Sequence, residues 1–275
     1  MNNGNLKIGF IGGGNMTQAI IGGLVRSGHT PQCLLVADPD PAQSKRIHSI
    51  HAGIQVTTDN DATVNDADIV VLAVKPQIMA AVIGTLTLPA ESGTRVYLSI
   101  AAGITLNSLQ KLLDPAQAIV RIMPNQPALV GAGMSVLTAT PATSNEQKAR
   151  AFYAAEAMGA AAWLDDEAMM DAVTAVSGSG PAYFYLFMEI IEACARDMGL
   201  PPDLASKLAR QTALGAGRAA AESELELETL RSSVTSKGGT TAAAISVLEQ
   251  PEFRAIVARA MLAARDRSIE LGKTN

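Results

Sequence analysis

The sequence has few of the residues that would link it to metals, disulfides, nucleic acids or membranes. It contains two cysteines and three histidines among 275 residues, and its net charge is −5. Cys33 and Cys194 are far apart and form no disulfide framework, and no His/Cys/Asp cluster has metal-ligand spacing. No basic tract is present to attract nucleic acid or an anionic membrane. We therefore expect no metal, no nucleic-acid partner and no membrane partner.

Long apolar runs are missing as well. No stretch reaches the roughly 18 uninterrupted apolar residues of a membrane-spanning helix. Residues 1–16 lack the basic start and apolar run of a signal peptide. The low cysteine content agrees with a reducing compartment. These features predict a cytoplasmic protein, and a hydrophobic content of 48% is enough to form real cores.

The first half of the chain alternates short β-rich runs with helical stretches. Continuous apolar runs typical of strands buried on both faces occur at 6–11, 33–37, 67–74, 95–100 and 118–123. Helical patterns such as 15–28 and 76–86 separate them, which implies a parallel sheet with right-handed crossovers. A further strand at 133–139, a helix and a short run at 161–165 end this part near residue 163.

From Asp165 onward the pattern is helical and rich in alanine. Helix-length segments at 166–178, 181–199, 201–223 and 251–271 are separated by glycine and proline. Residues 183–195 are apolar nearly all round, as in a helix buried in a core or against another subunit. The sequence thus predicts an α/β fold, with a Rossmann-type doubly wound parallel sheet over 1–163 and an all-helical domain over 164–275.

A glycine turn, FIGGGNM, follows the first predicted strand and opens the first predicted helix. Gly12 and Gly14 form the G-x-G part of a dinucleotide fingerprint, where the backbone approaches a pyrophosphate at a helix N-terminus. Thr17 stands at the third position, where Gly or Ala is more usual. We interpret the turn as a nucleotide site; the alternative is a glycine turn in a fold that binds no nucleotide.

The coenzyme type stays open. Asp38 ends the second predicted strand, where an acidic residue commonly bonds the adenosine ribose and favours NAD. Lys45 and Arg46 follow on the next helix, where they could meet the 2′-phosphate of NADP or could simply be solvated charges.

Candidate catalytic residues are scarce at the strand ends. His29, His48 and His51 all lie in or near the first two crossovers, away from the strand C-termini. Alcohol oxidation generally needs a positioned base, whereas reduction of a protonated imine does not, so this absence favours C=N reduction. Lys75 either binds a ligand or only begins a helix with Pro76 in its first turn. Ser177 and Ser179 are more typical of helix capping than of catalysis.

Six segments together resemble the pyrroline-5-carboxylate reductase family across essentially the whole chain. They are FIGGGNM, AVKP, SIAAG, MPNQPALV, VSGSGPAY and SKGGTTAAAISVLE, in the order and spacing of that family. The resemblance implies a Rossmann domain and a helical dimerisation domain that forms a dimer or larger homo-oligomer. It also implies hydride transfer from NADPH or NADH to the C=N bond of Δ1-pyrroline-5-carboxylate, which gives L-proline.

The same resemblance assigns the site residues. Gly12, Gly14, Asn15 and Met16 match the pyrophosphate turn, Asp38 and Asn60 the adenosine side, and Ala73, Lys75, Pro76 and Ala102 the nicotinamide side. Gly239, Thr240 and Thr241 match the substrate clamp, in which the Thr241 hydroxyl reaches the ring nitrogen and is the catalytic group. The family usually has proline where Lys237 stands, and often Ser or Asn where Asp38 stands.

The physical character of the substrate agrees with this assignment. The substrate is a small anion, and a glycine turn at a helix N-terminus offers unpaired amides to a carboxylate. The alternative for residues 239–241 is ordinary capping, with Thr240 or Thr241 as the N-cap. Coenzyme and substrate would then each use a helix N-terminus, one in each domain, from the same or different subunits.

Two other functions remain open at this point. A β-hydroxyacid dehydrogenase also joins a Rossmann domain to a helical one, but it places a catalytic lysine on the first long interdomain helix, and residues 181–199 contain none. A non-catalytic dinucleotide sensor that signals through a helical dimer is the third possibility; such a sensor would not need an intact clamp.

Overall fold

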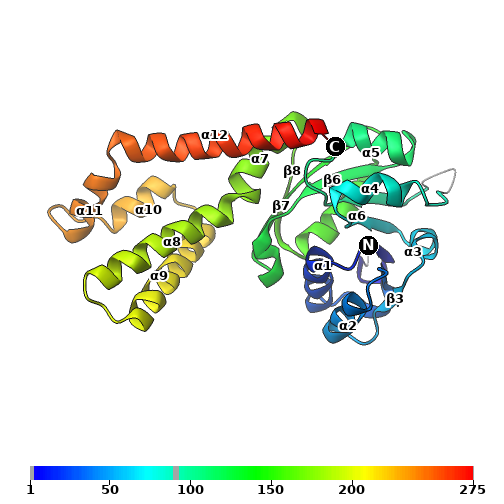
Figure 1. The fold of residues 1–275 in the computed structure, drawn as a ribbon, viewed down its shortest axis with the longest axis horizontal. Helices are drawn as coiled ribbons and strands as arrows, with labels where there is room; N and C mark the ends of the chain where they lie inside the picture. Colours follow the sequence, from blue (N-terminus) through cyan, green and yellow to red (C-terminus); the bar gives the residue numbers. More distant parts are fainter. Residues whose placement is uncertain (1–2, 89–92, 275) are drawn as a thin grey trace. The chain divides into compact units, whose positions relative to one another are not determined.

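The computed structural model describes residues 3–88 and 93–274, and its central feature is one eight-stranded sheet (Figure 1). The strand order is β3-β2-β1-β4-β5-β6-β7-β8. Strands β1 to β6 run parallel, β7 pairs antiparallel with β6, and β8 pairs parallel with β7. The sheet is therefore doubly wound and parallel over its first six strands, as predicted, with two reversed strands added at one edge.

The strands are β1 Ile8–Ile11, β2 Leu34–Ala37, β3 Gln55–Thr57, β4 Ile69–Leu72, β5 Val96–Ser99, β6 Ile119–Met123, β7 Gly133–Ala139 and β8 Gly159–Trp163. The helices that pack on them are α1 Asn15–Arg26, α2 Pro41–Ile50, α3 Asn60–Asp66, α4 Pro76–Ile83, α5 Leu106–Leu113 and α6 Asn145–Glu156. The later helices are α7 Met170–Val173, α8 Gly180–Asp197, α9 Pro202–Glu222, α10 Leu227–Ser233, α11 Thr240–Leu248 and α12 Pro251–Thr274.

The predicted apolar runs all become strands, because burial on both faces demands continuous apolar sequence. Every residue of β1, β2, β4 and β5 is buried. The prediction missed β3, whose three residues are partly or fully exposed and show no apolar run.

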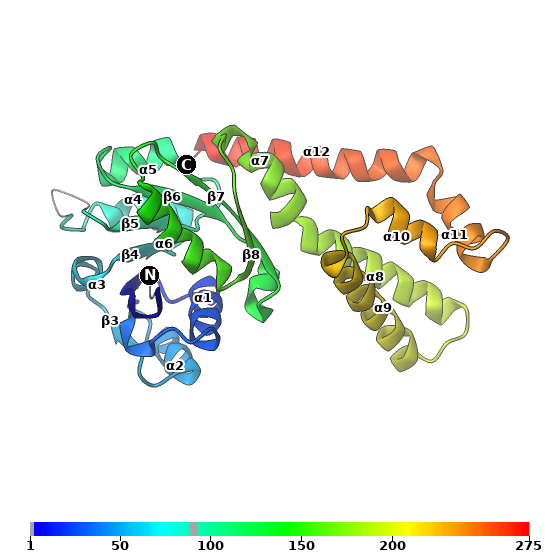
Figure 2. The same cartoon turned by 180° about the vertical axis from the view of Figure 1, so that it is seen from behind.

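Helices cover both faces of the sheet (Figure 2), and a cluster of buried apolar side chains lies between the sheet and the helices on each face. One core gathers buried side chains of α1, α2 and α6, such as Ile20, Ile47 and Ala151. The other gathers side chains of α3, α4 and α5, such as Val64, Met79 and Leu109. These layers hold the strands in place, so the loops at the strand ends start from a rigid base.

Contacts divide the chain into two compact units. The first comprises residues 1–179 and 264–275, and the second comprises Gly180–Ala263. The boundary predicted after residue 163 coincides with the end of β8, and the chain from 164 to 179 packs with the sheet. The assignment of 1–163 and 164–275 as functional domains stays a prediction.

The second unit is helical and exposes many apolar side chains. On α8, the exposed fraction is 70% for Phe184, 57% for Leu186 and 50% for Ile190. Of the two alternatives for the apolar segment 183–195, burial inside a core of the same chain is therefore wrong.

Two segments between helices have a defined local structure. Thr174–Gly178 form a π-helical turn that runs from α7 towards α8. The acidic segment 222–228 spans a helix break, because α9 ends at Glu222 and α10 begins at Leu227. Within the described residues, no helix combines the length and apolar character needed to cross a membrane.

Gly23 of α1 packs directly against the backbone at the end of α6. A Cβ atom on Gly23 would lie 1.8 Å from the Ala157 carbonyl oxygen, which is backbone and cannot yield easily. A Cβ on the neighbouring Gly22 would meet only the flexible Arg26 side chain, at 3.2 Å. The two adjacent glycines thus differ in what a methyl group would meet.

We predict that Gly23→Ala lowers the free energy of unfolding by about 2 kcal/mol or more, the range of overpacking in a well-packed core. The matched control, Gly22→Ala, is expected to be neutral or to stabilise by about 0.5–1 kcal/mol through helix propensity. Urea unfolding followed by circular dichroism measures both. Equal effects of the two substitutions would contradict the close packing of Gly23 against α6.

Candidate active site

The carboxyl ends of β1 to β5 share one edge of the sheet, because these strands are parallel. The chain winds to opposite sides of β1, so the strand order reverses between β1 and β4, the point where open α/β sheets bind ligands. All ten residues predicted for the coenzyme follow these strand ends: Gly12, Gly14, Asn15, Met16, Asp38, Asn60, Ala73, Lys75, Pro76 and Ala102. The structure therefore brings them to one edge of the first unit.

The turn after β1 requires glycine at position 12. Gly12 has a φ of +103°, and a Cβ atom there would lie 2.8 Å from the carbonyl oxygen of Ala73, just after β4. Its N–H donates to the Ala37 carbonyl at the end of β2, at 2.8 Å. The left-handed backbone and the close approach to β4 both exclude a side chain.

Thr17, the departure from the usual fingerprint, stabilises this turn. It is fully buried, and its hydroxyl donates to the Gly12 carbonyl oxygen at 2.6 Å. The third position of the fingerprint normally takes a small residue for close packing of helix and strand. In this chain the buried Thr17 side chain packs there and also forms a hydrogen bond inside the turn, so the turn keeps its shape although the third residue is neither Gly nor Ala.

The N-terminus of α1 is open to a ligand. Gly14 is the N-cap and provides no side-chain cap, and a Cβ on Gly14 would meet no atom within 4 Å. The first N–H groups of a helix have no partner within the helix, and the helix dipole favours an anion there. Gly14, Asn15 and Met16 thus present backbone to open space, which fits the pyrophosphate of a dinucleotide.

Asp38 is joined to this turn. Its carboxylate accepts hydrogen bonds from the backbone N–H of Gly13 at 2.7 Å and of Asp40 at 2.8 Å. It therefore holds the loop after β2 against the loop after β1. Asn60, the other predicted adenosine-side residue, is the first residue of α3, whose N-cap is Asp59.

The predicted nicotinamide-side residues follow β4 and β5. Ala73 donates its N–H to the Ile11 carbonyl at 2.9 Å, which ties the end of β4 to the end of β1. Lys75 is the N-cap residue of α4 without a side-chain cap bond, and Pro76 is the first helical residue. Lys75 thus begins the helix. Ala102 is exposed in the loop after β5.

The second glycine turn lies in the helical unit and precedes α11. Gly239 is the N-cap of α11 without a side-chain cap, so the interpretation of Thr240 or Thr241 as the N-cap is wrong. Gly238 has a φ of +75°, and a Cβ on Gly239 would lie 2.5 Å from Ser236 Oγ. Thr240 is exposed and Thr241 partly buried in the first turn of α11. Their role in substrate binding stays a prediction.

The histidines lie away from the carboxyl edge. His29 is buried between α1 and β2 and shares a 2.9 Å hydrogen bond with the Tyr153 hydroxyl. Burial lowers the pKa of His29 below its ordinary value of 6.5. His48 and His51 end α2, ahead of β3. Among the described residues, no three His, Cys, Asp or Glu side chains are grouped to hold a metal ion.

Sequence reasoning missed a link between the end of β6 and the π-helical turn. The Asn125 side chain donates to the Ser177 carbonyl oxygen at 3.2 Å, and its Oδ1 accepts from the Met134 N–H at 2.9 Å. Ser177 lies within the helical turn and does not cap it. Asn125 and Ser177 are 52 positions apart, so no spacing in the sequence indicates the pair.

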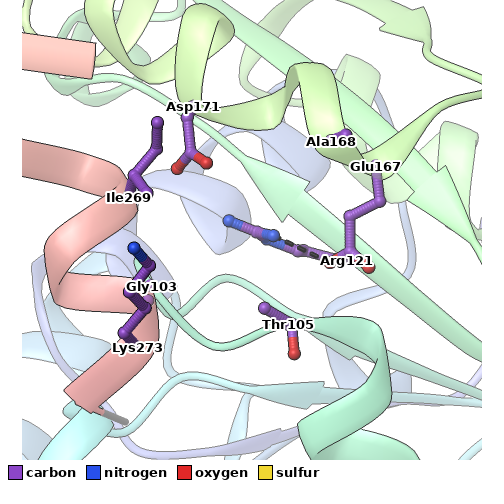
Figure 3. Close-up of a pocket in the computed structure, with 9 residues that line it drawn as sticks. Gly103, Thr105, Arg121, Glu167, Ala168, Asp171, Ile269 and Lys273 are labelled. Carbon is purple, nitrogen blue, oxygen red and sulfur yellow. Dashed lines mark hydrogen bonds and ion pairs between the residues drawn. The ribbon is translucent and has the colours of Figure 1, made fainter. Parts of the chain in front are cut away.

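It also missed an ion pair between a buried arginine and a partly buried glutamate. Arg121 of β6 is 5% exposed, and its Nη1 lies 2.7 Å from Glu167 Oε1, which also accepts from the Leu106 N–H at 2.8 Å. Figure 3 shows the pair beside a cavity of about 280 Å³. Lys273 and Asp171 also line it, so its charges balance. In the sequence, this ion pair is indicated by the single arginine inside the apolar run that forms β6.

Comparison with known proteins identifies the family. Residues 167–271 match the family model described as pyrroline-5-carboxylate reductase dimerisation, and residues 7–103 match the one described as NADP oxidoreductase coenzyme F420-dependent. The chain is 46% identical to the pyrroline-5-carboxylate reductase of Pseudomonas aeruginosa over 97% of both chains. It is 38% identical to the enzyme of that name from Escherichia coli, over 98% of this chain and 99% of the other.

Solved structures agree with this. The pyrroline-5-carboxylate reductase of Coxiella burnetii superposes with a TM-score of 0.93 at 38% identity, over 97% of this chain and 98% of the other. The Plasmodium falciparum enzyme, solved with NADP bound, gives a TM-score of 0.82 at 29% identity over 98% of both chains. The sheet order, the open glycine turn and these relatives lead to one conclusion: the chain belongs to the pyrroline-5-carboxylate reductase family.

Proposed function

We propose that this chain reduces the C=N bond of Δ1-pyrroline-5-carboxylate to L-proline with a hydride from NAD(P)H, the final step of proline biosynthesis. The observation that carries this proposal is the 46% identity to a pyrroline-5-carboxylate reductase over 97% of the chain. The open helix N-terminus after β1 supports it independently, because it fits the pyrophosphate of the coenzyme.

The coenzyme lies along the carboxyl edge of the sheet in this proposal. Gly12, Gly14, Asn15 and Met16 bind the pyrophosphate, and Asp38 and Asn60 flank the adenosine. The nicotinamide end lies by Ala73, Lys75, Pro76 and Ala102. When bound, the dihydronicotinamide supplies a hydride; the protein residues fix where that hydride can go.

The substrate binds at the second glycine turn. Gly239, Thr240 and Thr241 bind the carboxylate there. The N–H groups of Thr240 and Thr241, the first in helix α11, face the carboxylate, while the Gly239 N–H donates to the Ser236 carbonyl at 3.0 Å and holds the turn. The dipole of the nine-residue helix α11 favours the negative charge. The Thr241 hydroxyl accepts a hydrogen bond from the protonated ring nitrogen and orients the imine. A new C–H bond forms at C5, and the π electrons of C=N become the lone pair of the amine nitrogen. Hydride transfer requires both ligands to meet, whichever copy of the chain supplies each turn.

The absence of a histidine at the carboxyl edge suits this reaction. The proton is already on the imine nitrogen before the hydride arrives, so no base has to act in the same step. A β-hydroxyacid dehydrogenase would need such a base. The first long helix after the sheet, α8, contains no lysine that could act as one. We therefore disfavour that alternative. In a non-catalytic sensor, the glycine turn of α11 would have no substrate to bind.

The helical part would also join two copies of the chain. α8 exposes five large apolar side chains, Phe184, Leu186, Phe187, Ile190 and Ile191, and exposed apolar patches mark sites of protein–protein interaction. Residues 164–275 then form the substrate and dimerisation domain, and 1–163 the coenzyme domain, of a cytoplasmic homodimer or larger assembly.

The direct test of the reaction is absorbance at the NAD(P)H band with pyrroline-5-carboxylate as substrate. We expect coenzyme oxidation that depends on the substrate and yields proline. Absence of consumption at millimolar substrate would overturn the proposed activity and favour the sensor.

Replacing Thr241 tests its role at the ring nitrogen. We predict that Thr241→Ala lowers kcat/KM by about 10–100-fold, because one hydrogen bond to a charged group is worth roughly 1.5–3 kcal/mol. Thr229→Ala on α10, an exposed threonine of the same unit, serves as the control and should keep normal kinetics. Unchanged kinetics in the Thr241 variant would remove this residue from the mechanism.

The apolar surface of α8 predicts self-association. We expect sedimentation at micromolar concentration to give a dimer or larger species, and Phe184→Glu to lower the mass, because a charge would be buried without a partner. A wild-type monomer at that concentration would contradict the role of α8 in self-association.

A further inference from the structure

We propose that this chain binds NADH in preference to NADPH, because the residues around the adenosine ribose leave no favourable place for a 2′-phosphate. The inference rests on the coenzyme site of the proposed function and adds a selectivity to it. Three features of the loop after β2 support it: the fixed carboxylate of Asp38, the closed N-terminus of α2 and the position of the nearby cations.

Asp38 is held where the ribose of a dinucleotide is expected. The residue that ends the second strand of this fold meets the ribose hydroxyls. Both Asp38 oxygens accept backbone N–H groups, Oδ2 from Gly13 and Oδ1 from Asp40, so the side chain cannot swing aside without breaking two hydrogen bonds. Each oxygen keeps a lone pair for a ribose hydroxyl, which can donate. A 2′-phosphate is mostly the dianion at neutral pH, so it has few protons to donate and would face a fixed negative charge.

The N-terminus of α2 offers no second anion site. Asp40 is its N-cap, and Asp40 Oδ1 accepts the Ala42 N–H at 2.9 Å. Pro41, at the first helical position, has no N–H. A 2′-phosphate would therefore find two of the first donors unavailable and a second carboxylate in their place.

The cations of α2 stand too far along the helix to offset this. Gln43 faces the coenzyme turn: its Cβ would lie 3.2 Å from a Cβ on Gly13. Lys45 is two residues further, about 200° around the helix from Gln43, so it points away from the turn. Arg46 is exposed and lies six residues after Asp40, which is more than one helical turn. Exposed, flexible cations contribute little to the free energy of binding.

The experiment is a fluorescence or calorimetric titration of the full-length protein with NADH and with NADPH, without substrate. We expect NADPH to bind at least about tenfold more weakly, since a phosphate of about −1.5 to −2 charge lies beside a carboxylate. Asp38→Ser should narrow or invert that ratio. Glu156→Gln, which removes an exposed carboxylate at the end of α6, is the charge-matched control and should leave it unchanged.

The ratio of the two dissociation constants separates selectivity from structural damage, because a loosened turn would weaken the binding of both coenzymes to the same extent. Equal or tighter binding of NADPH to the wild-type protein would overturn the preference and leave the proposed reaction standing. An unchanged ratio in Asp38→Ser would overturn the role of the Asp38 carboxylate in selectivity. A selective loss of NADPH binding in a Lys45→Ala/Arg46→Ala variant would overturn the claim that these cations lie too far along α2 to meet a 2′-phosphate. Failure to bind either coenzyme would overturn this inference and the proposed function together.

Discussion

The carboxyl edge of the sheet, where we propose that the coenzyme binds, depends on how closely the turn after β1 approaches the end of β4. A side chain at Gly12 would lie 2.8 Å from the Ala73 carbonyl, and the Gly12 N–H is bonded to the end of β2. One residue thus sets the distance from β1 to both neighbouring strands. Because α1 begins shortly after it, the same contact determines where its open N-terminus points. The loops after β2 and β4 can act on one coenzyme only while this spacing is kept.

In the proposed function, the two glycine turns have the same task, which is to hold an anion with backbone N–H groups. Each leaves the first N–H groups of a helix uncapped, the first at α1 and the second at α11. Backbone donors fix position through geometry and do not move when a ligand arrives. In our proposal, the carboxylates of Asp38 and Asp40 then disfavour a second anion at the ribose end of the site, and the Asp38 carboxylate also holds the turn after β1 through the Gly13 N–H.

The strands were predictable because continuous apolar runs leave few alternatives to a doubly covered sheet. β7 has the limits predicted, Gly133–Ala139, whereas β3 is short and half-exposed and leaves no such run. The reversal at β7 has a signal that was not used: nine residues separate it from β6, too few for a parallel crossover. The contacts of Asn125 with Ser177 and of Arg121 with Glu167 join distant positions, which local pattern does not reveal. The two glycine turns could be recognised in the sequence, but the hydrogen bonds of the Asp38 carboxylate could not.

The central claim is that hydride passes from the coenzyme to the imine carbon of a small anionic ring. It is tested most directly with NADH that carries deuterium at both positions of nicotinamide C4, incubated with the protein and pyrroline-5-carboxylate. Mass spectrometry and NMR then locate the label in the product. We expect proline with one deuterium at C5. Unlabelled proline, or no proline despite bound coenzyme, would contradict direct hydride transfer.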